Sequence, residues 1–233
     1  MIFPSNTEFN RKLPKQRFYE NLSISASVKK LFVEQIKAIY WQNKLSEETI
    51  SLKATDTVQE IEVFRIILNQ KTIDESVLRL LDKGIPYHII FILEYEEQVK
   101  LCTAYKEITP TGSCSLVTEY YYSEWENEEA VQLAISGLTL EKAYEGFVRQ
   151  IANEKIAVKS TNIKRDVEIS LRIERLKKEI DRTEKLARKE KQPKKKFDLV
   201  DQERALQGEL ESLLQMTLEI TPKEVEVTIE KKN

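Results

Sequence analysis

The 233-residue sequence has one histidine, two cysteines and five glycines, and these shortages exclude several classes of site. A histidine-based nucleophile triad, or a zinc site of the usual His/Cys type, would have to rely on His88 alone. Neither a phosphate-binding loop nor a dinucleotide-binding glycine pattern is present. Cys102 and Cys114 are too few for a disulfide framework, so we expect two buried thiols in a reducing compartment. We therefore predict no resident metal and no cofactor.

Long apolar runs are also missing. The longest run, residues 89–93, is far shorter than the ~20 residues that a helix needs to cross a bilayer. Residues 1–15 lack the apolar segment of a signal peptide. We therefore predict a cytoplasmic protein that has no membrane partner.

Neither sign of charge dominates the chain. Its 37 Lys and Arg and 39 Asp and Glu give a net charge of −2, so no overall basic field attracts it to nucleic acid. The hydrophobic share of 41% is enough for a core. The charged share of 33% is high for a globular domain and indicates a long, solvated helical element.

Apolar periodicity predicts helices and strands in alternation over residues 1–153. Residues 26–43 carry apolar side chains at steps of three and four positions, which predicts one amphipathic helix capped by Ser25. Further helices are expected at 73–83 and from Thr139, an N-cap, to about residue 153. Nearly continuous β-branched and aromatic residues predict strands at 61–68, 87–95, 99–106 and 114–122. This order is typical of an α+β domain with a mixed or antiparallel sheet and packed helices.

The C-terminal part has a different pattern. Apolar side chains in residues 164–216 follow a short heptad seam on either side of Pro193, which breaks a helix. The pattern predicts an antiparallel, coiled-coil-like helical hairpin with its tip near Pro193. Residues 217–233 alternate apolar and acidic side chains, and both a terminal strand and a loose tail are consistent with them. The first arm of the seam consists of Ile169, Ile173, Leu176, Ile180, Thr183 and Ala187.

The predicted tip of the hairpin is strongly basic. Seven cations and one acid between positions 185 and 196 give a local charge of +6, so the rest of the chain carries −8. Clustered cations release counterions from nucleic acid, which makes this segment a candidate phosphate contact. A solvated helix end is the alternative interpretation. The candidate nucleic-acid-binding residues are Lys185, Arg188, Lys189, Lys191, Lys194, Lys195 and Lys196.

A few carboxylates could form a catalytic site. Glu60 and Glu62 are two positions apart in a predicted strand and therefore share one face of it. A magnesium-dependent nuclease needs two or three carboxylates, usually with a lysine, and Lys106 could supply the lysine. Ordinary salt-bridged side chains are the alternative interpretation. Further acids that could lie nearby are Asp56, Asp82 and Glu94.

Several short motifs resemble a known family. In chain order they are FNRKLPK at 9–15, EIEVF at 60–64, GIPYHIIF at 84–91, AYK at 104–106 and EKQP at 190–193. Together they resemble the bacterial and archaeal domain-of-unknown-function family numbered 4391. The resemblance implies no settled activity and assigns no catalytic residue. It implies a gene neighbourhood of helicases and DNA methyltransferases in restriction or phage-defence islands, which is an association rather than a mechanism.

These observations lead to three hypotheses. The first is an accessory interaction protein of a DNA-modification or phage-defence complex, with a helicase or DNA methyltransferase as partner and with phosphate contact through the basic tip. The second is a divergent metal-dependent nuclease that uses Glu60, Glu62 and Lys106, and only this one requires Mg²⁺. The third is a structural protein that dimerises through residues 169–187. We favour a protein that is not an enzyme.

Overall fold

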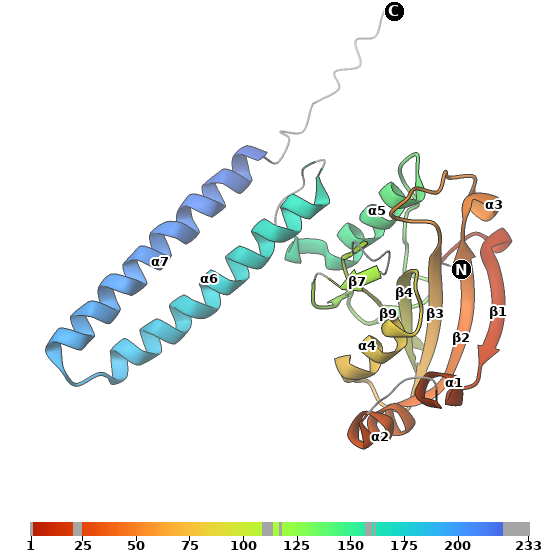
Figure 1. Cartoon of the computed structure of the whole chain (residues 1–233), viewed down its shortest axis with the longest axis horizontal. Coiled ribbons are helices and arrows are strands. Elements are labelled where there is room, and N and C mark those ends of the chain that lie inside the picture. Colours follow the sequence, from red (N-terminus) through yellow and green to blue (C-terminus); the bar gives the residue numbers. More distant parts are fainter. Residues whose placement is uncertain are drawn as a thin grey trace, which may run out of the picture. The chain divides into compact units, whose positions relative to one another are not determined.

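The computed structural model describes residues 2–20, 25–108, 114–116, 118–156, 160 and 162–220. The chain divides into two compact units, Met1–Asn153 and Glu154–Asn233. The first unit contains a sheet and its helices (Figure 1). Its elements are η1 (Ser5–Thr7), β1 (Glu8–Leu13), α1 (Gln16–Glu20), α2 (Ala26–Gln35), β2 (Ile36–Leu45), α3 (Glu47–Ile50), β3 (Ile61–Leu68), α4 (Glu75–Lys83), β4 (His88–Tyr95), β5 (Gln98–Thr103), β6 (Lys106–Ile108), β7 (Cys114–Leu116), β8 (Tyr121–Tyr122), β9 (Glu126–Asn127) and α5 (Leu140–Ala152).

The main sheet of the first unit is mixed. Its strand order is β1-β2-β3-β4-β5-β8, and β9 also pairs with β5. The pair β3 and β4 is parallel and is connected through α4, whereas the other pairs of this sheet are antiparallel. A mixed sheet with packed helices confirms the α+β prediction. The strands β6 and β7 form a separate antiparallel pair.

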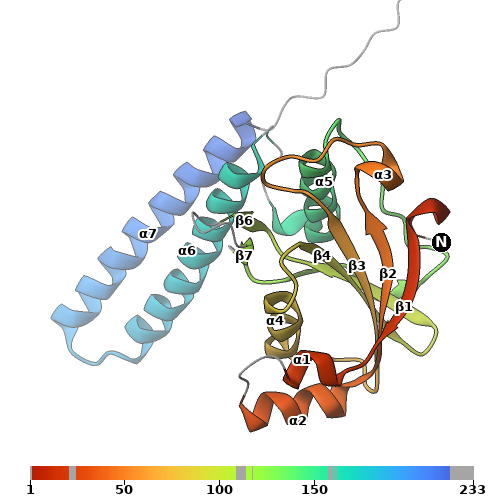
Figure 2. The same cartoon turned by 45° about the vertical axis from the view of Figure 1, so that its right-hand side comes forward.

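The sheet buries both of its faces. On one face, Phe32 of α2 and Leu81 of α4 pack with Phe64 and Phe91 of the central strands, in a cluster that also includes Phe18 of α1. On the other face, the Tyr144 ring of α5 lies with its centroid 4.4 Å from that of His88. Figures 1 and 2 show α1, α2 and α4 gathered at one side of the sheet and α5 apart from them. The two-sided cover explains why the central strands are nearly continuous apolar runs.

The prediction of one helix over residues 26–43 is wrong. The helix ends at Gln35, and residues 36–45 form β2 between β1 and β3. Apolar side chains still recur at steps of three and four positions in this segment, but here the spacing does not mark the face of a helix. Ile36 is extended, with φ −102° and ψ 124°. The backbone of β2 forms interstrand hydrogen bonds with β1 on one side and with β3 on the other. These bonds outweigh the weak helical preference of the local sequence.

The later strands are shorter than expected. The predicted strand at 99–106 is β5, which stops at Thr103, and Lys106 already belongs to β6. The predicted strand at 114–122 is two strands, β7 and β8. The N-cap prediction at Thr139 is confirmed, because its hydroxyl accepts the backbone N–H of Lys142 at 3.3 Å.

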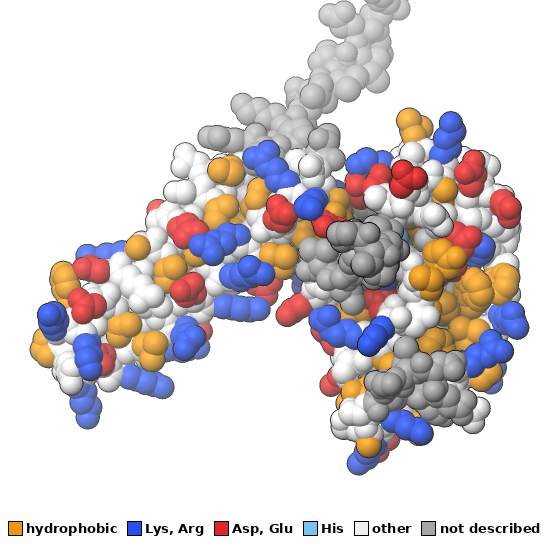
Figure 3. All heavy atoms as spheres, in the orientation of Figure 1, with side chains coloured by type: hydrophobic (Ala, Val, Ile, Leu, Met, Phe, Trp, Pro, Cys, Tyr) orange, Lys and Arg blue, Asp and Glu red, His pale blue; other side chains and the backbone are white. Residues whose placement is uncertain are grey.

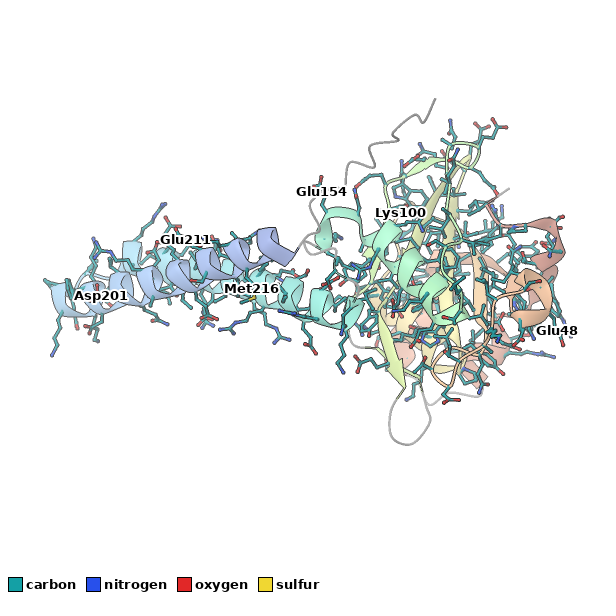
Figure 4. The ribbon with its side chains drawn as sticks, turned by 90° about the horizontal axis from the view of Figure 1, so that it is seen from above. Glu48, Lys100, Glu154, Asp201, Glu211 and Met216 are labelled. Atoms are coloured by element: carbon teal, nitrogen blue, oxygen red, sulfur yellow. The ribbon has the colours of Figure 1, made fainter. Side chains whose placement is uncertain are left out.

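The second unit contains the predicted helical hairpin. After the 3₁₀ turn η2 (Asn153–Lys155), it consists of α6 (Ile163–Lys189) and α7 (Pro193–Ile220). Ile169 and Ile173 of α6 pack against Leu210 and Leu213 of α7. Asp201, Glu211 and Met216 mark the course of α7 in Figure 4. None of the helices in the described residues is both long and apolar enough to cross a membrane.

The hairpin follows the expected seam. The seam residues of α6 are buried, apart from the half-buried Ile180. Pro193 opens α7, where its missing N–H and fixed φ fit the first helical position. Helix α7 continues to Ile220, four residues beyond the predicted end of the hairpin. The predicted terminal strand or tail began at residue 217, so its first four residues belong to this helix, and residues 221–233 lie outside the described residues.

Candidate functional site

The structure brings Glu60 and Glu62 together at the start of β3. Glu62 lies opposite Lys44 of β2 in the strand register. Glu60 forms an ion pair with Lys44 of β2 at 2.7 Å. Glu62 is only 2% exposed, and its Oε2 accepts the indole N–H of Trp41 at 2.6 Å. The predicted shared face of these two acids is therefore observed, with a lysine that the sequence did not indicate beside them.

The environment of Glu62 changes its protonation. Burial raises the pKa of the Glu62 carboxyl to about 7, and the neighbouring Glu60 adds to the shift. The Trp41 hydrogen bond and the Lys44 charge oppose it. A carboxyl with a pKa near neutrality can hold or release a proton at physiological pH, which is the property required of an acid–base or a ligand-sensing group.

Lys106 has a different partner from the one expected. Its ammonium group forms an ion pair with Asp82 of α4 and donates to the Tyr87 carbonyl at 3.2 Å. The Tyr120 hydroxyl donates to the other Asp82 oxygen at 2.7 Å. The side chains of Lys106 and Asp82 are 3% and 1% exposed. Lys106 therefore makes a structural contact with Asp82. The lysine that lies beside Glu60 is Lys44.

The other titratable groups considered from the sequence form ion pairs elsewhere, are exposed, or are buried with shifted pKa values. Glu94 forms an ion pair with Arg65 at 2.6 Å, and Asp56 is exposed. Burial, together with the Lys106 charge, lowers the pKa of His88 to about 3. Burial raises the pKa of the Cys102 thiol. Within the described ranges, no three His, Cys, Asp or Glu side chains are placed to share a metal ion.

A pocket of about 340 Å³ opens beside Glu62. Its lining combines aromatic and apolar side chains with two charged ones. Glu62 is buried, whereas Arg17 of α1 is exposed. Such a mixture is usual for sites that bind small organic groups. The pocket is lined by Leu13, Arg17, Phe18, Trp41, Glu62, Phe64 and residues 84–87.

The basic tip lies where the hairpin turns. All seven candidate cations are exposed. Lys185 pairs with Asp181 at 2.7 Å, and Arg188 pairs with Glu184. The remaining five have no ion-pair partner among the described residues. Figure 3 shows Lys and Arg side chains gathered at the left-hand end of the hairpin. The five that form no ion pair are Lys189, Lys191, Lys194, Lys195 and Lys196.

Sequence reasoning missed a second basic segment. Four cations occur between positions 11 and 17, and aromatic residues precede and follow them at Phe9 and Phe18. Basic residues interleaved with aromatic ones are the usual composition of a single-strand-binding surface. This signal could have been found, but two prolines made the segment look like an irregular entry. The structure places it on β1 and α1, beside the pocket.

Comparisons with known proteins give a family and no activity. The family model described as "Domain of unknown function (DUF4391)" matches residues 1–210. No curated protein and no solved structure matches the chain. The match covers all five motifs noted in the sequence, including the EKQP segment at the hairpin turn. The chain therefore belongs to the DUF4391 family.

Proposed function

We propose that this protein is a cytoplasmic accessory protein of a DNA-modification or phage-defence complex, and that its helical hairpin contacts the phosphate backbone of nucleic acid through the basic tip. The observation that carries the proposal is the group of five exposed cations that have no ion-pair partner in the described structure. Unpaired cations on a well-formed hairpin are available to replace the counterions of a phosphate backbone.

The position of three of these cations adds support. Lys194, Lys195 and Lys196 occupy the first turn of α7, which contains no acidic residue. Cations at a helix N-terminus oppose the helix dipole and cost about 0.3–1 kcal/mol each. A helix start optimised for stability would carry Asp or Glu there. The same dipole adds to the positive potential at the tip, which favours an anion.

The single acid of the tip segment has a structural role in the turn. Glu190 accepts the backbone N–H of Gln192 at 2.8 Å. This hydrogen bond is the main reason why the pKa of Glu190 is lowered. The carboxylate therefore serves the turn between α6 and α7, and the charge of the surrounding lysines is largely uncompensated.

Charge reversal at the tip tests the proposal. We expect the variant with Lys191, Lys194, Lys195 and Lys196 changed to Glu to bind duplex DNA at least ~10-fold more weakly at about 0.1 M salt. We also expect the slope of log affinity against log salt to become smaller by about three to four, because each phosphate contact contributes about 0.9. Fluorescence anisotropy with a labelled duplex, measured at several salt concentrations, gives both quantities.

A matched control separates the tip from overall charge. Lys29, Lys30, Lys37 and Lys53 are exposed lysines of the first unit, and their change to Glu alters the net charge by the same amount. This control should keep most of the affinity and the salt slope. Equal losses in both variants would show that only net charge matters and would refute the tip as a contact.

The partner is tested separately. Family resemblance suggests a helicase or a DNA methyltransferase, so we expect the tagged protein to retain one of these from its host after nuclease treatment. Retention would establish a protein-level accessory role. Loss of every such partner on nuclease treatment would leave nucleic acid as the only link and would contradict the accessory part of the proposal.

The geometry gives less support to the two other hypotheses. Glu60 and Glu62 do lie together, but Lys106, the lysine proposed for a nuclease site, pairs with Asp82. The seam proposed for dimerisation packs Ile169 and Ile173 against α7 of the same chain. Neither arrangement favours a second function over the accessory role.

A further inference from the structure

Three aromatic rings form a row that leads from the surface of the first unit to the Glu62 pocket. Phe9 of β1 is 45% exposed, and its ring centroid lies 4.2 Å from that of Trp41. Trp41 is stacked on Phe64 at 6.2 Å with an interplanar angle of 26°. Trp41 and Phe64 also line the pocket. Figure 3 shows hydrophobic side chains gathered over the region of β1 to β3.

Cations lie on the same face as this row. Arg11 pairs with Trp41 in the register of β1 and β2, so the two side chains share one face of the sheet. Arg17 lines the pocket itself. Lys12 has the opposite orientation and lies over the Tyr40 ring, and Lys15 donates to the Ile36 carbonyl at 2.6 Å. The pocket thus combines aromatic walls with two arginines, one in its lining and one on the adjoining face of the sheet.

The pocket lining also offers a hydrogen-bond acceptor, the carboxyl of Glu62. The Trp41 indole N–H donates to Oε2 of the Glu62 carboxyl at 2.6 Å and orients it. A carboxylate at the end of an aromatic slot can accept an N–H from the edge of a nucleobase, as Glu and Asp accept from the amino group of cytosine. Enzymes and single-strand binders hold unpaired bases in the same way, by stacking plus hydrogen bonds to the Watson–Crick edge.

We propose that this pocket binds one unpaired nucleobase that carries an exocyclic amino group, within a single strand whose adjoining base stacks on Phe9 and whose phosphates contact Arg11 and Arg17. The site belongs to the first unit and does not depend on the basic tip. The expected ligand class is single-stranded nucleic acid with cytosine-like bases, because the Glu62 carboxylate accepts a hydrogen bond from an amino donor. Thymine presents the acceptor O4 where cytosine has its amino group, so it cannot donate to the carboxylate from that position and keeps only N3–H as a donor.

The test uses the full chain with the tip lysines already changed to Glu, so that the tip no longer contributes. Oligodeoxycytidylate and oligothymidylate of about 12 nucleotides are compared by fluorescence anisotropy. The measurement is made at pH 8, where Glu62 is ionised because its pKa is about 7. We expect oligodeoxycytidylate to bind roughly 5- to 10-fold more tightly.

Two variants and a control decide the roles. Phe9→Ala should weaken both oligonucleotides roughly 10-fold, since a stacking partner is lost. Its control is Leu138→Ala, another exposed apolar residue of the first unit at 88% exposure, which should change the affinity for neither oligonucleotide.

Glu62→Gln should abolish or reverse the cytosine preference, because the amide donates to thymine O4. Equal binding of the two oligonucleotides, no binding of either, or an unchanged preference in Glu62→Gln would overturn this proposal while leaving the tip result untouched.

Discussion

Replacing Lys106 by methionine should lower the free energy of unfolding of the first unit by about 3–5 kcal/mol. Lys106 and Asp82 are a buried ion pair, with side chains 3% and 1% exposed. Methionine keeps much of the volume of the lysine stem but removes the charge. The buried Asp82 carboxylate would lose its cationic partner and keep the hydrogen bond from the Tyr120 hydroxyl at 2.7 Å. An uncompensated buried charge is among the most costly changes in a protein core.

Tryptophan fluorescence during urea unfolding measures this effect in the right unit. The sequence has two tryptophans, Trp41 and Trp125, and both belong to the first unit. The signal therefore reports its unfolding and not that of the hairpin. The matched control is Lys30→Met, which breaks an exposed pair with Glu34. It should change stability by less than about 1 kcal/mol.

A double variant identifies the cause. Adding Asp82→Asn to Lys106→Met removes the orphaned charge while keeping an oxygen that can accept from Tyr120. We expect the double variant to regain most of the lost stability. A single Lys106→Met variant as stable as the control would mean that the pair is not a structural contact. The catalytic hypothesis for Lys106 would then regain interest.

The second large effect is a dependence of stability on pH that comes from Glu62. Its pKa is about 7 in the folded protein, against an ordinary value of 4.5. Between these two values the folded state binds a proton that the unfolded state does not. The stability that Glu62 contributes is therefore complete below pH 4.5 and is lost as the pH rises through 7. The loss for a shift of this size is about 3 kcal/mol.

Comparison with Glu62→Gln isolates this contribution. The amide side chain of this variant resembles the protonated carboxyl and does not ionise. We expect the variant to match the wild type near pH 5 and to exceed it by about 2–3 kcal/mol at pH 8, measured by urea unfolding with tryptophan fluorescence. Other groups, including His88 with its lowered pKa, are present in both proteins and cancel in the difference.

The surroundings of Glu62 specify what else must be checked. The groups that face it are Glu60, Lys44, Trp41, and, from the pocket lining, Arg17 and Tyr87. Glu60→Gln would alter the same network and is not a control. Glu48→Gln in the exposed part of α3 should show the same difference from wild type at both pH values. A constant offset for Glu62→Gln as well would mean that the Glu62 carboxyl does not change protonation in this range.

Parts of the candidate site could be predicted and parts could not. The i, i+2 spacing of Glu60 and Glu62 was enough to place them on one face, because side-chain alternation is a local property of a strand. Their partners come from elsewhere. Lys44 and Trp41 reach them from β2, most of which lies within the stretch 26–43 that the periodicity assigned to a helix. An error in one element therefore hid the two side chains that define the environment of Glu62.

The basic tip was visible in the sequence because it is a contiguous run. Seven cations in twelve positions need no tertiary structure to be close together. The four cations of residues 11–17 were also close together in the sequence, yet their meaning depended on the neighbouring strand. The pairing of Arg11 with Trp41 shows that this segment borders an aromatic row.

Local signals in the sequence were sufficient for several elements. These include the apolar runs of β3 and β4, the Thr139 cap of α5, and the two arms of the hairpin around Pro193, each set by neighbours within a few residues. Tertiary contacts were needed to decide that residues 36–45 form a strand, that β3 and β4 are parallel, and that Lys106 pairs with Asp82. In each of these cases the deciding free energy comes from partners distant in the chain, through ladder hydrogen bonds, shared burial and charge, and no local pattern encodes which partner will be there.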